Sequence, residues 1–202
     1  MSMAVTRAVL GLAALVGLCA VAPAPAAASS ARSRVAACPH ANTPANLASA
    51  RTMRTAVVCL VNQERKRFGL PRLRESVRLD RSAQGHSDDM VRRNYFAHVA
   101  PGGSSPFDRI SATGYRWSAA GENIATGFPT PASVITAWMW DFGHCQNILE
   151  PPYAHIGIGV NARGVPRFAS GPATWTQDFG LPAGARAPSH NGRPAAGCPR
   201  GL

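Results

Sequence analysis

Apolar residues recur at helical spacing in two long segments of the first half of the chain. The first segment follows Thr43-Pro44, where threonine can cap a helix and proline fits its first turn. It stops before Gly69 and Pro71, which both interrupt helices. Its inner face is predicted to carry Ala50, Met53, Val57, Leu60, Val61, Glu64 and Phe68. A second helix is predicted from Val77 to Asn94, with an inner face of Leu79, Ala83, His86 and Met90.

Two shorter helices are predicted further along. Ser105–Ala112 has the pattern of a short helix that Gly114 ends. The next helix opens at Thr130-Pro131, again a cap followed by proline. Gly143 is predicted to end that helix in a left-handed conformation.

Strand patterns concentrate in the second half. Tyr115–Ala125 is predicted to be a loop followed by a short strand. His155–Val160 alternates branched apolar residues with glycine, as a strand does when another element packs close to its glycine face. Val165–Ala169 is interpreted as a short edge strand because it contains Pro166, and Thr174–Phe179 as the terminal strand. Because helices come first and most strands last, an α+β fold with an antiparallel sheet is predicted.

Composition divides the chain into four segments. Residues 1–28 resemble a secretory signal peptide: one charge, Arg7, precedes an apolar run from Ala8 to Ala22, and small residues offer cleavage near Ala28. The apolar run is too short for a transmembrane anchor. Residues 29–44 are predicted to be an arm, 45–180 one folded domain, and 181–202 a tail rich in proline, glycine and alanine. We therefore expect a secreted protein.

The chain is strongly basic, with a formal net charge of +11, and Lys66 is its only lysine. Removing residues 1–28 takes away Arg7 and no acid, which leaves +10 (11 − 1). Such a surface would adhere to anionic cell-wall polymers or lipid head groups. Nucleic acid is disfavoured as a partner because the arginines are dispersed and no aromatic-rich reading motif accompanies them. We expect a monomer.

Four cysteines follow the predicted cleavage site, an even number that suggests two disulfides in an exported protein. Three pairings are possible. We favour Cys38–Cys59, which would tie the arm to the first long helix, together with Cys145–Cys198, which would hold the tail near His144.

Two histidines and two acids stand beside apolar or aromatic residues and would form one cleft if the fold brought them together: His98, Glu122, Asp141 and His144. Asp141 shares a helix face with Val134 and Trp138, at i+7 and i+3 from them, so it is expected on a buried stripe in the last helical turn. There the helix dipole disfavours a negative charge, and His144 or a metal ion would supply the compensating cation.

Other polar and aromatic residues are assigned structural roles. His86 lies on the apolar face of its helix and is interpreted as a buried structural histidine, and His155 is given no role. The asparagines Asn123 and Asn147 are expected to make structural hydrogen bonds. The tryptophans are expected in the core or the cleft wall: Trp138, Trp140 and Trp175. No G-x-S-x-G or H-E-x-x-H motif is present.

Eight short motifs then occur in a characteristic order: Leu60–Arg65, His86–Met90, Tyr95–His98, Gly121–Ala125, Trp138-Met139, Gly143-His144 with Asn147–Leu149, Ile156–Val160 and Trp175–Gly180. Together they resemble a bacterial CAP domain, also called an SCP domain, over about residues 50–180. This superfamily includes cysteine-rich secretory, venom-antigen and plant pathogenesis-related proteins.

The resemblance implies an α-β-α sandwich with a central cleft. It also implies that the cleft tetrad is His98, Glu122, Asp141 and His144, and that the histidines bind a divalent cation. Zinc is the expected metal because imidazole suits it better than calcium or magnesium. Two function classes follow. The first is a secreted module whose cleft binds a cation and a lipid or cell-wall ligand. The alternative is a metal-assisted extracellular hydrolase or peptidase with Glu122 as general base.

Overall fold

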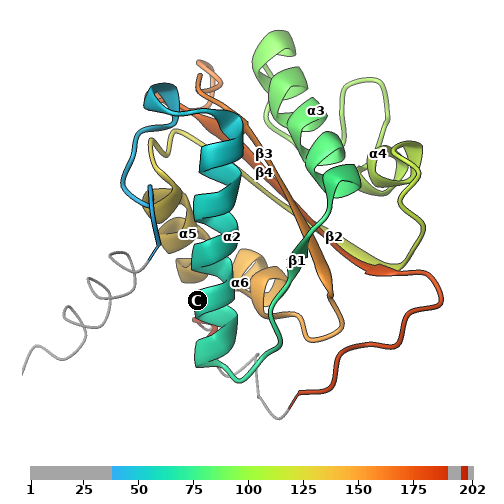
Figure 1. Ribbon diagram of the computed structural model, residues 1–202. Coiled ribbons are helices and arrows are strands. Elements are labelled where there is room, and N and C mark those ends of the chain that lie inside the picture. Colours follow the sequence, from blue (N-terminus) through green and yellow to red (C-terminus); the bar gives the residue numbers. More distant parts are fainter. Residues whose placement is uncertain (1–37, 191–196, 200–202) are drawn as a thin grey trace, which may run out of the picture.

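Helices cover both faces of one four-stranded sheet in the computed structural model, which describes residues 38–190 and 197–199 (Figure 1). The predicted signal peptide and residues 29–37 of the predicted arm lie outside these ranges. The elements are η1 (Ala45–Leu47), α2 (Ala50–Arg67), β1 (Arg74–Glu75), α3 (Val77–Arg93), α4 (Pro106–Ala112), β2 (Trp117–Thr126), α5 (Pro131–Trp140), α6 (Phe142–Leu149), β3 (His155–Asn161) and β4 (Thr174–Pro182).

The sheet has the strand order β1-β3-β4-β2. β4 pairs antiparallel with both β2 and β3, and the two residues of β1 pair parallel with the start of β3. Helices α3 and α4 pack on one face, whereas α2, α5 and α6 form the layer on the other (Figure 1). The fold is therefore α+β, an α-β-α sandwich as expected. No helix in residues 38–190 or 197–199 is both long and apolar enough to cross a membrane.

Several boundaries differ from those predicted. β2 is a ten-residue strand, longer than expected. β4 continues through Leu181 and Pro182, which the sequence pattern placed in the tail. The predicted strand Val165–Ala169 is wrong: Phe168 and Ala169 both donate their N–H groups to the Val165 carbonyl in a turn. Val165 is buried, so it packs as an anchor of a loop and not as part of the sheet.

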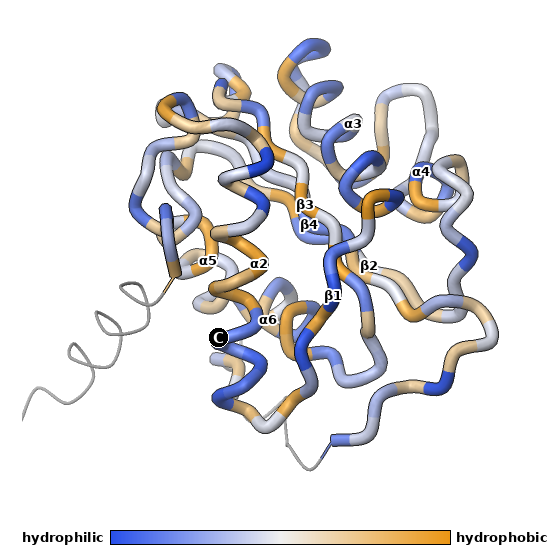
Figure 2. The backbone as a smooth tube through the Cα atoms, viewed as in Figure 1, coloured by the Kyte–Doolittle hydropathy of each residue, from blue (hydrophilic) through white to orange (hydrophobic). Residues whose placement is uncertain are grey.

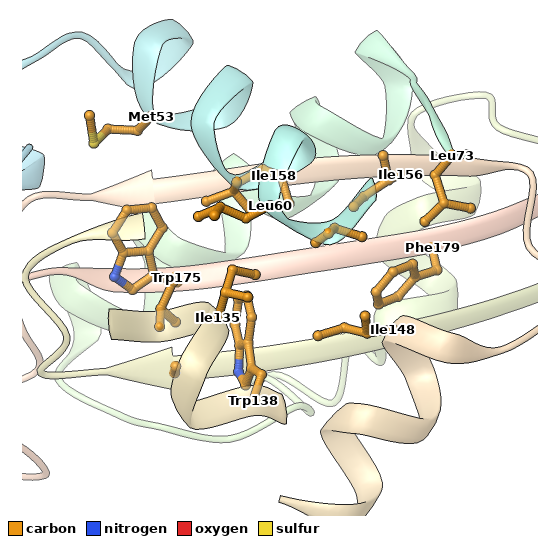
Figure 3. Close-up of a cluster of buried hydrophobic side chains, with 14 of the residues drawn as sticks. Met53, Leu60, Leu73, Ile135, Trp138, Ile148, Ile156, Ile158, Trp175 and Phe179 are labelled. Atoms are coloured by element: carbon orange, nitrogen blue, oxygen red, sulfur yellow. The ribbon is translucent and has the colours of Figure 1, made fainter. Parts of the chain in front are cut away.

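The main hydrophobic core lies between the sheet and the layer formed by α2, α5 and α6. Alternate residues of β3, such as Ile156 and Ile158, face this core. Figure 3 shows the side chains converging from both layers: Met53, Leu60, Leu73, Ile135, Trp138, Ile148, Ile156, Ile158, Trp175 and Phe179. On the other face α3 is amphipathic, and hydrophilic and hydrophobic residues alternate along its turns in Figure 2.

The glycines of β3 set how closely α3 approaches the sheet. A Cβ added at Gly157 would lie 2.2 Å from the Leu79 carbonyl carbon, and one added at Gly159 would lie 2.2 Å from that of Ala83. Real Cβ atoms do not occur at such distances, so α3 can occupy this position only because both residues lack a side chain. The predicted close packing on the glycine face of this strand is present in the structure.

Side chains of α3 also pair with the backbone of β3 beyond the short strand β1. Asp80 Oδ1 accepts a hydrogen bond from Ile158 N–H at 2.9 Å. Gln84 accepts from Val160 N–H at 3.1 Å and donates to Val160 O at 2.9 Å. These bonds satisfy backbone groups that a longer β1 would otherwise have paired with.

A buried arginine joins α2 to the chain around α6. Arg65 is fully buried and donates to four carbonyl groups, those of Pro71, Ile148, Glu150 and Tyr153, at 2.9–3.4 Å. Burial lowers its pKa to about 10, so the guanidinium still carries its charge at neutral pH. These carbonyls belong to loops and a helix end, where no regular backbone partner is available.

Two disulfides, Cys38–Cys59 and Cys145–Cys198, are present, and they are the favoured pairings of the three. The first ties the chain before η1 to α2. The second joins α6 to the chain near the C-terminus across 53 residues. Closing a loop of this length disfavours the unfolded chain.

The same substitution at two glycines is expected to have opposite effects on stability. Gly157→Ala should lower the free energy of unfolding by about 3 kcal/mol or more, because its methyl group would force α3 away from the sheet. Gly85→Ala should raise it by about 0.5–1 kcal/mol, since Gly85 is an exposed interior residue of α3 with nothing within 4 Å of an added Cβ. Urea denaturation of both variants measures this. Equal effects would contradict the close contact between α3 and β3.

Candidate functional site

The first histidine of the site lies in the loop after α3 and binds a carboxylate of β2. Asn94 ends α3 in the left-handed conformation, with φ 53°, and turns the chain toward His98. His98 Nδ1 lies 2.8 Å from Glu122 Oε1. An ionised carboxylate can only accept, so Nδ1 carries the proton and Nε2 of the neutral ring keeps its lone pair. Half of the His98 side chain is exposed, whereas Glu122 is almost fully buried.

The second histidine has the same arrangement. His144 Nδ1 lies 2.8 Å from Asp141 Oδ1, so its Nε2 is also left with the lone pair. Burial lowers the pKa of His144; the charge of Asp141 opposes this, and the nearby His98 lowers it further. At neutral pH His144 is therefore a neutral imidazole. No hydrogen bond to Nε2 of either histidine comes from the part of the chain that the structure describes.

The expected position of Asp141 on a buried helical stripe is wrong. α5 ends at Trp140, and Asp141 is the N-cap of α6, where its carboxylate accepts from His144 N–H at 3.0 Å. Its side chain is 58% exposed. That hydrogen bond is the main cause that lowers the pKa of Asp141, so the carboxylate stabilises a helix start instead of opposing a helix end.

A further expectation for this corner is wrong for the same reason, namely that α5 ends at Trp140. Gly143 lies inside α6 and does not end α5 in a left-handed conformation. Trp140 is 77% exposed, outside the core, because α5 turns its opposite face to the sheet. Trp138 is buried as expected, and its ring lies 6.5 Å from that of His144.

Arg109 of α4 holds the Glu122 side of the site together. Its guanidinium donates to Glu122 Oε2 at 2.7 Å, to the His98 carbonyl at 2.9 Å and to the Ser104 carbonyl at 2.9 Å. Glu122 thus has one oxygen on a histidine and the other on an arginine. The loop that carries His98 is fixed to α4 and to β2 by one side chain.

An amide network fixes α6, and with it His144, to β2. Asn123 Nδ2 donates to the His144 carbonyl at 3.1 Å and to Gln177 Oε1 at 3.0 Å. Asn147 Nδ2 donates to Asn123 Oδ1 at 2.8 Å and to the Glu122 carbonyl at 3.2 Å. The two asparagines therefore have the structural role expected of them, and they set the spacing between the two halves of the site.

Two carbonyl groups of β2, those of Glu122 and Ile124, point away from the neighbouring strand. Gly127 N–H donates to Ala173 O, which places Glu122 and Ile124 at positions where the carbonyls face the outer edge. Both carbonyls accept hydrogen bonds from helix side chains. Asn147 binds the first, and Trp138 Nε1 donates to the second at 3.2 Å.

A further acid, Asp178, lies on β4 as the cross-strand partner of Glu122. Asp178 is fully buried, and no hydrogen bond of ordinary geometry reaches its carboxylate oxygens from the described residues, although Ser82 lies close to it. Burial and the charge of Glu122 raise its pKa well above the usual range. His86 of α3 completes the buried wall, with Nε2 3.0 Å from Ala97 O and 4.0 Å from Glu122.

His86 is a structural histidine, as the sequence predicts. Its Nε2 donates to a carbonyl oxygen and has no lone pair to offer, and burial lowers its pKa. Within residues 38–190 and 197–199, no group of three or more His, Cys, Asp or Glu side chains is arranged to hold a metal ion. The described residues therefore show no closed coordination shell.

Comparison with known proteins identifies the family. The model of the cysteine-rich secretory protein family, CAP, matches residues 58–179, which is more than half of the chain. The chain belongs to the CAP family. Among curated proteins, uncharacterized protein YkwD of Bacillus subtilis is 43% identical to this CAP protein over 123 residues, which cover 61% of this chain and 45% of YkwD. The uncharacterized membrane protein YlbC of the same bacterium is 32% identical over 112 residues, 55% of this chain and 32% of YlbC.

The fold is shared with solved structures. An extracellular SCP-domain protein from Bacillus anthracis aligns with a TM-score of 0.57 and 27% identity, covering 66% of this chain and 44% of that one. An outer surface protein of Borrelia burgdorferi aligns with a TM-score of 0.55 at 17% identity, over 62% of this chain and 90% of that one. The matched part of this CAP protein spans less than half the length of YkwD and YlbC.

Two residues of the site, Arg109 and Asp178, are missing from the set that the sequence predicts for this CAP domain. Arg109 is one of many dispersed arginines, and nothing in its spacing connects it with Glu122. Asp178 can be noticed in the sequence, because it is the one acid in a strand of uncharged residues and its burial would need a special environment.

Replacing Asp141 tests its role as a helix cap. Asp141→Ala should lower the free energy of unfolding at pH 7 by about 1 kcal/mol, and Asp141→Asn by less, because asparagine can still accept from His144 N–H. The pKa of Asp141 is lowered from 3.8, so its stabilising effect is present above that value and is lost as the pH falls through the lowered pKa. Urea denaturation at pH 7 and pH 2.5 measures both effects. A constant difference between parent and Asp141→Ala would contradict the charged cap.

Proposed function

We propose that this CAP-domain protein is secreted and binds one divalent cation through Nε2 of His98 and of His144. The observation that carries the proposal is the matched anchoring of the two rings. In each, Nδ1 is 2.8 Å from a carboxylate oxygen, Glu122 for one and Asp141 for the other. Carboxylates that hold Nδ1–H are the usual support for histidines that bind a metal through the other nitrogen.

The donor chemistry favours zinc. Neutral imidazole is a good ligand for Zn²⁺ and a poor one for calcium or magnesium, which prefer oxygen. Burial lowers the pKa of His144 and so keeps the lone pair of its Nε2 available at neutral pH. With two protein nitrogens, the remaining positions of a tetrahedral zinc would belong to water or to a ligand. We propose that this ligand is a lipid or a cell-wall component, bound outside the cell.

The alternative, a metal-assisted hydrolase with Glu122 as general base, is less well supported by the geometry. Glu122 Oε1 accepts from His98, and Oε2 accepts from Arg109 at 2.7 Å. Both carboxylate oxygens already hold other side chains in place, and a general base would have to give up one of these contacts on taking a proton. Glu122 serves better as the group that orients His98.

Zinc binding can be tested by calorimetric titration of chelator-stripped protein at pH 7.5 and 5.5. His98→Ala and His144→Ala should each abolish binding, because each removes one of two protein ligands. Asp141→Asn should weaken binding less, since an amide can still hold the ring. Affinity should fall at the lower pH because protons compete for the imidazole nitrogens.

His190→Ala is the matched control, an exposed histidine outside the site. It should bind zinc like the parent. If both site variants also bind zinc as tightly as the parent, the two histidines do not form a metal site.

A further inference from the structure

We infer that the end of the sheet where β1, the start of α3 and the start of β2 meet is a binding site for a phosphate-bearing anionic polymer. This surface does not include His98 or His144, and the inference stands independently of cation binding. It consists of Arg74, Arg78, Arg116 and His155, arranged around the buried Tyr115.

Side-chain contacts and strand pairing place these residues together. Arg74 is paired in register with His155, because β1 runs alongside the start of β3. His155 Nδ1 is 3.0 Å from the hydroxyl of Tyr115, which is followed directly by Arg116. Arg78 reaches the same loop, since a Cβ added at Gly114 would lie 3.8 Å from Arg78 Nε. Figure 2 shows β1 as a strongly hydrophilic stretch at this end of the sheet.

The three arginines are exposed and lack acidic partners. None of them makes an ion pair with any residue in the described ranges. Two acids of the same segment, Glu75 and Asp80, lie 3.5 and 3.8 Å from the guanidinium of Arg54. Three exposed guanidinium groups without an ion pair in the described ranges therefore lie at this end of the sheet, and guanidinium groups can bind phosphate oxygens bidentately.

His155 adds a directed donor to this charge. Burial raises the pKa of Tyr115 to about 12, so its hydroxyl is neutral and can donate to Nδ1 of His155. The proton of the neutral imidazole then sits on Nε2, which can donate to an anion oxygen. Burial lowers the pKa of His155, and Arg74 lowers it further, as expected of a ring beside unneutralised cations.

The neighbouring side chains favour a polymer of phosphodiesters over nucleic acid or a bilayer. The ring at the centre of the site, Tyr115, is buried and packed against Gly180, so it cannot stack on a base. The exposed large apolar side chains nearby are Val77 and Phe107, whose ring packs against Trp117, and two such side chains give little insertion into a membrane. Repeated phosphates spaced along a flexible chain match separate guanidinium groups.

The test compares two triple variants that remove the same charge. Arg74→Gln/Arg78→Gln/Arg116→Gln removes the proposed site. Arg51→Gln/Arg163→Gln/Arg167→Gln removes three exposed arginines that lie outside this surface and likewise make no ion pair in the described ranges. The probe is synthetic poly(glycerol phosphate), with binding measured by calorimetry at several salt concentrations. The site variant should bind about tenfold more weakly or worse, and its slope of log K against log salt should fall by about 2. The control variant should lose much less.

The parent protein gives a second measurement that does not depend on any variant. Titration of His155 by NMR should show its pKa rise when the polymer binds, since phosphate charge would offset that of Arg74. If the two triple variants lost equal affinity for the polymer, net charge alone would explain the binding, and the proposed site would be wrong. So would tighter binding to single-stranded DNA, or binding to vesicles of anionic phospholipid without binding to the polymer.

Discussion

The contact between the backbone of α3 and the two glycines of β3 is the constraint on which the arrangement of the site depends. It brings α3 so close to the sheet that Asp80 and Gln84 can act as pairing partners for β3. Helix α3 is then fixed along its length, and the loop that follows its C-terminal end places His98 beside the outer strand β2. A larger residue at Gly157 or Gly159 would move that loop without touching it.

The site is assembled from both helical layers across one strand. His98 comes from the α3 side and His144 from the α6 side, while Glu122 and Asn123 are adjacent residues of β2 whose side chains point to opposite faces. Each histidine is held by its own carboxylate, and the carboxylate of Glu122 is in turn held by Arg109. The placement of the two rings therefore depends on β2, which binds groups from both helical layers.

Much of this organisation follows from the sequence because it is local. Helical periodicity, the Thr130-Pro131 cap and the glycine alternation in β3 each require one kind of structure. The sequence pattern misplaces Asp141 because this residue lies seven positions after Val134 whether α5 continues through it or stops before it. The choice depends on where α5 stops, and the cap hydrogen bond to His144 decides it. Arg109 cannot be found from the sequence, since only the tertiary fold brings its helix and the preceding loop against Glu122 of β2.

The two borders of the sheet have one more property in common. On β2, the outward carbonyls of Glu122 and Ile124 are occupied by Asn147 and Trp138. On the opposite side β1 is only two residues long, and side chains of α3 bind β3 beyond it. An incoming strand would find these backbone groups already bound and would have to displace helix side chains to pair with them. The protein can thus carry Glu122 on its outermost strand while helix side chains cover part of the edge at which another strand could add.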